Sequence, residues 1–373
     1  MELIPFYMAG DFYLTNDIDC ENNRYPPIAG EFAGTLDGQG YTIKNLKIRS
    51  TSKGNIGLFE KLVAMPGTLR PALIQNINFE NVKIIGRNHI NRGLIAGRAD
   101  SAEFINIKVK GLSIAEIVEE ENFPFSGVSG GIIGHANDVT LTDVHITDVK
   151  IHKNAYAGGL LGTAANNVLI ERSSVTNLST EGDFCRNQGN CAQGGLVGRA
   201  IGAKDQQLTI SQSFAQGRID TRTEIGGLIG LVKLEQTVNI KNSYADVILA
   251  PPGCGNQGST CKYAGGLIGR AEGSRLDNAE PITLENVYAV GVVKLDADRH
   301  GRAIVGHDGQ EGSHRVKGSQ SYFDRDTTEK KNSGDKISIG LRTEEMTDPK
   351  NAAFSTWDRG IWQFEAGEYP KLY

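Results

Sequence analysis

The chain has 373 residues, 46 of them glycine, and a formal net charge of −5 at pH 7. This acidic balance, without any block of basic residues, argues against nucleic acid as a partner. No apolar run reaches the roughly 18 residues of a membrane span, so we expect no membrane insertion. Glycine is too frequent for long helices, which favours a fold of strands and turns.

The first strand is predicted within FYLTNDID (residues 12–19), and Cys20 directly after it is expected to be a buried free thiol. From there the chain repeats itself about every 35 residues, as expected for stacked structural units. The most regular phrase is a glycine box, written RGLIAGRA (92–99), GGIIGHA (130–136), GGLLGTA (158–164), GGLVGRA (194–200), GGLIGLV (226–232) and GGLIGRA (265–271). We expect the paired aliphatic residues to fill the core, with glycines at a corner because they permit positive φ and close backbone approach.

A second repeated phrase lies between the boxes, and its third position is mostly a side-chain amide. These positions are Asn45, Asn76, Asn106, Asp143, Arg172, Gln212, Asn242, Asn286 and Gln320. In stacked coils about 4.8 Å apart, such residues can form a hydrogen-bonded structural ladder at a corner. Asparagine also tolerates the left-handed backbone that a sharp corner needs.

The local pattern between the boxes is that of strands. LTDVHITDVKI (141–151) alternates apolar and polar residues, as a strand with one buried face does. One unit cannot bury its own apolar face, so the units must stack. We therefore predict one all-β domain of about nine coils over residues 1–340, closed by a C-terminal capping segment over residues 341–373. Within that segment, GLRTEEMTDP predicts one short helix, and both tryptophans follow it.

Two residues after each amide lies a position that should point outward. It is polar in the first coils and aromatic in the last four, at Phe214, Tyr244, Tyr288 and Tyr322. An exposed run of rings would be a binding surface, for instance for a sugar face. The alternative is a cross-strand aromatic stack that stabilises the sheet, or one that another segment covers.

The loops that precede three of the boxes are long and provide the second set of ligand-binding candidates. With the short connection 220–225 as a floor, they could form a shallow groove. The candidates are Glu119, Glu120, Glu121, Phe123, Phe125, Arg186, Asn187, Asn256 and Gln257. The alternative is that long surface loops are tolerated at little cost and bind nothing.

The phrases FCRNQGNC and GCGNQGSTC predict two short disulfides, Cys185–Cys191 and Cys254–Cys261. Persistent disulfides imply an oxidising compartment. Reduced surface thiols are the alternative, and zinc ligation does not suit these spacings. We expect no metal site and no cofactor.

The position after each box holds Arg98, His135, Thr163, Arg199, Leu231, Arg270 and His307. Such a row could bind phosphate or sulfate. The arginines are never on adjacent coils, however, which avoids the stacking of like charges. We therefore interpret the row as structural.

The G-G-L-[IV]-G boxes, together with FAGTLDGQGYTIKNLKI near the start and SYFDRDTTEKKNSG near the end, resemble the GLUG-motif repeats of bacterial surface and secreted proteins. Such repeats occur in adhesins and in the non-catalytic part of immunoglobulin A-cleaving peptidases. The resemblance implies a right-handed parallel β-helix, an extracellular or bacterial cell-surface location, and a place within a larger surface protein. It offers no catalytic motif, and the chain has no H-E-x-x-H metallopeptidase signature.

We therefore predict a non-enzymatic adhesin or ligand-recognition module, monomeric as an isolated domain. Its partner would be a glycan or a host or neighbouring-cell surface protein. Two alternatives remain, a β-helical carbohydrate-active enzyme and a passive spacer. An enzyme of that kind needs paired acids and bases on neighbouring coils. The predicted columns contain no such pair.

Overall fold

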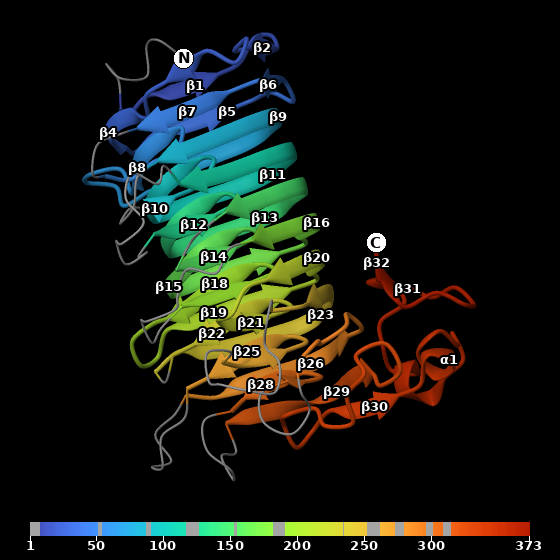
Figure 1. Cartoon of the computed structure of the whole chain (residues 1–373). Helices are drawn as coiled ribbons and strands as arrows, with labels where there is room; N and C mark the ends of the chain where they lie inside the picture. Colours follow the sequence, from blue (N-terminus) through green and yellow to red (C-terminus); the bar gives the residue numbers. More distant parts are fainter. Residues whose placement is uncertain are drawn as a thin grey trace.

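The computed structural model describes residues 8–50, 54–86, 91–116, 127–152, 155–181, 191–233, 235–251, 262–272, 280–295, 301–308 and 315–373. Across these residues the fold is all-β, with a single α-helix, α1 (Thr343–Met346), and one 3-10 helix (Ala352–Phe354). Figure 1 shows an elongated stack that runs downward from the N-terminal strands at the top, with the C-terminal segment folded back along one side.

The largest sheet has 23 strands. They are β1 (Asp11–Tyr13), β2 (Ile18–Asp19), β3 (Arg24–Tyr25), β4 (Ile28–Phe32), β5 (Thr35–Asp37), β6 (Thr42–Lys44), β7 (Lys47–Ser50), β8 (Phe59–Val63), β9 (Ala72–Gly86), β11 (Ala96–Glu116), β13 (Ile133–His152), β15 (Leu161–Glu171), β16 (Ser174–Glu181), β18 (Val197–Ile201), β19 (Gln207–Ser211), β20 (Phe214–Asp220), β22 (Ile229–Val232), β23 (Thr237–Leu249), β25 (Ile268–Ala271), β26 (Ile282–Ala289), β28 (Val305–His307), β29 (Val316–Asp324) and β30 (Ile339–Leu341).

A second sheet of seven short strands holds the residues just before the glycine boxes. Its strands are β10 (Asn91–Arg92), β12 (Val128–Gly130), β14 (Tyr156–Gly158), β17 (Ala192–Gly194), β21 (Glu224–Gly226), β24 (Ala264–Gly265) and β27 (Gly301–Arg302). In both sheets every strand pair is parallel, and each strand pairs with its equivalent one repeat later. The antiparallel pair β31 (Trp362–Gln363) and β32 (Lys371–Leu372) forms a separate two-stranded sheet.

The glycine boxes are bends at which successive coils touch through their backbones. A Cβ atom on Gly195 would lie 2.0 Å from the carbonyl oxygen of Gly227 and 2.5 Å from Cβ of Ala215. None of the box glycines has a positive φ, so only the close approach, and not left-handed backbone, requires glycine there. The aliphatic pair that follows, such as Leu228 and Ile229, is fully buried in the core, as the sequence predicted.

The amide column is a corner with left-handed backbone. Its φ values lie between 44° and 56° at Asn76, Asn106, Asp143, Arg172, Gln212, Asn242, Asn286 and Gln320. Side-chain bonds link some neighbours, as from Asn106 Nδ2 to Asn76 Oδ1 at 2.9 Å and from Asn286 Nδ2 to Asn242 Oδ1 at 3.1 Å. The ladder is therefore a series of pairs, and the shared feature of all its members is the backbone conformation.

Asn45 does not belong to this ladder. The pairing of β6 with β9 sets Lys44 beside Glu80, which places Asn45 at the next corner of the coil, level with Asn81. Asn81 also has a positive φ, of 55°. The mistake arose because two corners of one coil use the same residue type, so the phrase around Asn45 could be matched to either.

A second ladder lies just inside the amide corner and was not predicted. The backbone N–H of Ser173 donates to Oγ of Ser213 at 3.0 Å, and that of Ser213 donates to Oγ of Ser243 at 3.1 Å. The hydroxyl of Ser213 in turn donates to the carbonyl oxygen of Ser211 at 2.7 Å. Each buried serine thus satisfies polar groups of two coils without water.

Candidate functional site

Three aromatic residues of the outward column form a continuous stack, and the fourth, Tyr322, pairs with Tyr288 in the strand register. The ring centroids of Phe214 and Tyr244 are 4.7 Å apart, those of Tyr244 and Tyr288 are 4.8 Å apart, and both pairs are parallel within 3°. This confirms the predicted register of the column. The side chains are not open to ligand, however, because Tyr244, Tyr288 and Tyr322 are between 1% and 7% exposed.

The C-terminal segment, residues 343–373, covers this stack. The ring centroids of Trp362 and Tyr288 are 5.9 Å apart, and Nε1 of Trp362 donates a hydrogen bond to Oδ1 of Asn242. The hydroxyl of Tyr288 donates to the carbonyl oxygen of Pro370 at 2.5 Å, and burial raises the pKa of that phenol well above its ordinary value. The prediction of an exposed aromatic binding surface was therefore wrong, and the alternative of a covered stack holds.

The same contacts correct the expected position of the cap. The segment packs along the side of the stack, beside β23, β26 and β29 (Figure 1), whereas we had expected it to close the open end. A buried carboxylate holds the C-terminal segment at the point where it leaves the last strands. Asp324, which is fully buried, accepts hydrogen bonds from the hydroxyls of Thr343 and Tyr369 at 2.7 and 2.6 Å.

The loop candidates fall outside the described residues. This applies to Glu119, Glu120, Glu121, Phe123, Phe125, Arg186, Asn187, Asn256 and Gln257, and also to Cys185, Cys254 and Cys261. Cys20 is buried and carries a free thiol, as predicted. Cys191 is described, is buried, and is not free. The two pairings Cys185–Cys191 and Cys254–Cys261 remain predictions.

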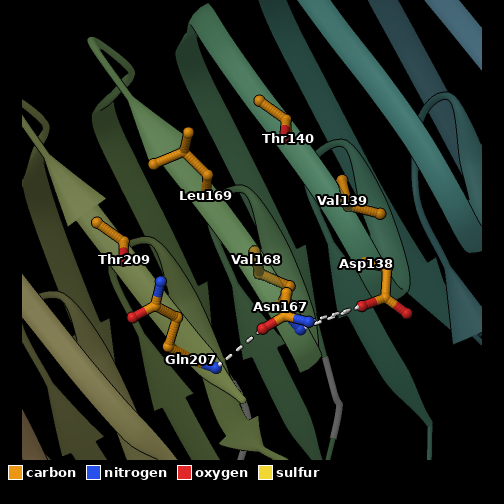
Figure 2. A pocket seen from close by; sticks show the side chains of 8 residues that line it. All are labelled: Asp138, Val139, Thr140, Asn167, Val168, Leu169, Gln207 and Thr209. Atoms are coloured by element: carbon orange, nitrogen blue, oxygen red, sulfur yellow. Dashed lines mark hydrogen bonds between the residues drawn. The ribbon is translucent and has the colours of Figure 1, made fainter. Parts of the chain in front are cut away.

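A hollow of about 330 Å³, which was not predicted, lies on the outer face of β13, β15 and β19. Figure 2 shows its three coils side by side. The lining residues are Asp138, Val139, Thr140, Asn167, Val168, Leu169, Gln207 and Thr209. We call this hollow the trough.

The register of the strands places the trough residues. Thr140 pairs with Leu169 and Leu169 pairs with Thr209, so a leucine lies between two threonines on the outer face. Two residues before each of these side chains stands a polar residue, Asp138, Asn167 or Gln207, and all three are exposed. The trough therefore has an apolar centre with hydroxyl groups on both sides and a polar rim along one edge.

Hydrogen bonds hold the rim in place (Figure 2). The side-chain amide of Asn167 donates to Oδ1 of Asp138 at 3.3 Å, and its Oδ1 accepts from the backbone N–H of Gln207 at 3.3 Å. Gln207 Oε1 accepts from Asn239 at 3.2 Å. Within the described chain, this leaves Asp138 Oδ2, Gln207 Nε2 and the two threonine hydroxyls available to a ligand.

The trough follows from unequal coil lengths. The pairing of β13 with β15 contains a register shift between Asn137 and Val139, which is a β-bulge. On the next coil, residues 202–206 form a connection before β19 that lies outside any strand. Irregular spacing between repeats was the available signal, because bulges and insertions interrupt the flat faces of stacked repeats.

The row after each glycine box is in register, as predicted, since Arg98 pairs with His135, His135 with Thr163 and Thr163 with Arg199. Across the bend it faces residues of the seven-stranded sheet. The guanidinium of Arg270 lies 3.3 Å from Oε1 of Glu224. Glu224 is fully buried and is also bound by Lys262 at 3.3 Å.

In the described part of the chain, no group of three or more His, Cys, Asp or Glu side chains is arranged to hold a metal ion. The same residues include no helix long and apolar enough to cross a membrane.

Comparison with known proteins relates the chain to immunoglobulin A1 proteases. It is 28% identical over 242 residues to the "Immunoglobulin A1 protease" of Streptococcus sanguinis, which covers 60% of this chain and 11% of that protein. The chain is thus similar to a part of an immunoglobulin A1 protease. It is also 28% identical over 341 residues to "Halomucin" of Haloquadratum walsbyi, covering 79% of this chain and 3% of that protein. The chain thus spans a small fraction of either relative.

No family model matches the chain. A solved structure from Bacteroides ovatus, whose name assigns it provisionally to the immunoglobulin A1 proteases, aligns with 98% of this chain and 86% of its own at 17% identity and a TM-score of 0.47. A structure named "IgA1 Protease" aligns with 87% of this chain and 20% of its own at 20% identity and a TM-score of 0.42.

Proposed function

We propose that this chain is a non-enzymatic ligand-recognition module of a secreted or cell-surface bacterial protein, and that its trough binds a glycan. We further propose that its coils are GLUG-type repeats wound as a right-handed parallel β-helix. The similarity to part of an immunoglobulin A1 protease and to halomucin supports membership of a larger surface protein. The isolated module is expected to be a monomer.

The single observation that supports glycan binding is the chemistry of the trough. Leu169 supplies an apolar centre against which the C–H face of a sugar ring can pack. Thr140 and Thr209 lie on either side of it and can exchange hydrogen bonds with sugar hydroxyls. Asp138 and Gln207 add an acceptor and a donor at the rim. Since three coils span roughly 10 Å, the trough fits a short saccharide.

The trough is better suited to binding than to hydrolysis. Glycoside hydrolysis generally uses two carboxyl groups on opposite sides of the scissile bond. Among the eight lining residues, Asp138 is the single carboxylate. The proposed function is therefore recognition, and the carbohydrate-active enzyme is not supported at this site.

A glycan array with the purified domain tests the proposal, with bound hits measured by calorimetry. Leu169→Arg would place a charged side chain across the apolar centre, and Asp138→Asn would remove the rim carboxylate while keeping a residue that tolerates its φ of 51°. Thr283→Arg is the matched control, because Thr283 occupies the same outward column on a later coil.

We expect Leu169→Arg to weaken saccharide binding at least tenfold and Thr283→Arg to leave it unchanged. Equal saccharide affinity of the wild type and Leu169→Arg would exclude the trough as the binding site. If the folded wild type bound no saccharide, the proposal of glycan recognition would fail, and a passive spacer would be the better explanation.

A further inference from the structure

The arginines in the row after the glycine boxes differ in their partners. Arg98 donates through Nε to both carboxylate oxygens of Asp100, at 3.0 and 2.8 Å. Arg270 is paired with Glu224 across the bend. Arg199 has no carboxylate partner among the described residues. The structural interpretation of the row therefore accounts for two of its arginines and leaves the charge of Arg199 uncompensated.

Two neighbouring groups fix the orientation of Arg199. Its Nε donates to the hydroxyl of Thr163 at 3.0 Å, and its Cζ atom lies 3.8 Å from the ring centroid of Tyr156. Both partners belong to the preceding coil, so the side chain leans one coil toward the N-terminus. A guanidinium that is already ordered loses little conformational entropy on binding, and its two Nη atoms suit a carboxylate or sulfate.

His135 is the next residue of the row beyond Thr163. Arg98 lies on the coil before it and Arg199 leans toward it from the other side, so the imidazole is flanked by two cations. Burial and, after it, the charges of Arg98 and Arg199 lower its pKa to about 4, while the carboxylate of Asp100 acts in the opposite direction. The ring is therefore neutral at pH 7 and can donate one N–H to an anion without adding like-charge repulsion.

We propose that Arg199 and His135 form a binding site for an oxyanion, namely the carboxylate or sulfate group of an acidic saccharide. The saccharide part rests on the proposed function, whereas the anion site stands on the row itself. The two sites share a corner, because His135 and Asp138 are three residues apart on β13. A glycan whose neutral ring occupies the trough would thus extend its acidic substituent around this corner.

Inorganic sulfate is the direct probe of the anion site. NMR spectra of arginine Nε–H groups and histidine rings would be recorded during a sulfate titration of the wild type, Arg199→Gln and Arg199→Lys. Arg218 is the internal control, since it is exposed and already bound to Asp220. We expect saturable shifts at Arg199 and His135, none at His135 in Arg199→Gln, and weaker binding in Arg199→Lys, which keeps the charge but not the planar fork.

A second measurement identifies the ligand class. Binding of matched sulfated and unsulfated N-acetyllactosamine, and of trigalacturonate and its methyl ester, would be compared in the wild type, Arg199→Gln and Leu169→Arg. In at least one pair, the acidic saccharide should bind the wild type tenfold more tightly than its neutral partner. Arg199→Gln should abolish this difference and leave the affinity for the neutral saccharide unchanged.

The outcomes separate the two proposals. Sulfate shifts that fail to saturate, or that appear equally at Arg218, would overturn the anion site and leave the trough untouched. Saturable sulfate binding without any acidic preference would overturn the saccharide assignment. A neutral saccharide that still binds Leu169→Arg would count against the trough and not against Arg199.

Discussion

One outward column runs along the side of the stack, and the C-terminal segment covers one half of it but not the other. From Phe214 to Tyr322 the residues are aromatic and packed against the C-terminal segment, and the first three rings stack on one another. From Asn78 to His145 the same position is polar and bare of that segment. The strands of both halves pair in parallel, so the halves differ in the side chains of this column and in the second layer packed on it.

The largest effect should come from removing that layer. Deletion of residues 343–373 would expose the rings of Tyr244, Tyr288 and Tyr322 together, and contiguous exposed apolar surface promotes association. We expect aggregation, measured by light scattering and size-exclusion chromatography. A soluble, monomeric truncated chain would show that the covered half does not need its second layer.

A single ring in the covered half should also matter greatly. Tyr288→Ala removes a fully buried ring from the middle of the stack, together with its bond to Pro370. We expect a loss of about 3–5 kcal/mol in unfolding free energy by chemical denaturation, as is usual for large aromatic residues in cores. Lys108→Ala, in the bare half of the same column, should change it by less than about 0.5 kcal/mol. Similar losses in both variants would remove the distinction.

The amide corner runs through both halves and should respond moderately. Asn106→Ala places an ordinary L-residue at a φ of 54° and removes the bond to Asn76. We expect a loss of about 1–2 kcal/mol, the usual cost of left-handed backbone. Asn106→Gly loses the same side-chain bond without this strain, so it should be the more stable variant. Greater stability of the alanine variant would contradict the role assigned to the backbone.

The last prediction concerns the pH dependence of stability and the partly buried His135 on β13. The pKa of His135 is lowered to about 4 in the folded chain, so the unfolded chain binds more protons between that pH and about 6.5. Its contribution is therefore present above pH 6.5 and is lost as the pH falls toward 4. The midpoint temperature of His135→Gln should fall less than that of the wild type between pH 7 and 4.5. Parallel curves would show that His135 is not the group involved.

Repetition made most of the fold predictable from the sequence. The strand pattern at 141–151, the buried pair in each box and the left-handed corner residues all follow from rules that hold within one coil. Asn45 was assigned to the wrong corner because two corners of a coil accept the same residue, and only strand pairing tells them apart.

The sites were less predictable because they depend on relations between coils. The trough arises where a bulge near Asn137 and an insertion before Gln207 interrupt two successive repeats. The cover over Tyr288 could not be read from local pattern either, because Trp362 lies 74 residues further on and its position depends on how the chain turns after Asp324. The sequence analysis identified the aromatic column and the tryptophans of the C-terminal segment, but it did not predict that they contact each other.

The covered aromatic stack also limits how a chain of this kind can change in length. Adding one whole turn before Phe214 would lengthen the bare half and leave every contact of residues 343–373 intact. Adding it between the coils of Asn242 and Tyr288 would move these residues about 4.8 Å further apart and separate Trp362 from one of them. Adding it between Tyr288 and Tyr322 would likewise separate two rings that both contact Trp357. Duplication and loss of repeats should therefore accumulate on the N-terminal side, while the turns from β23 to β29 are inherited as a block.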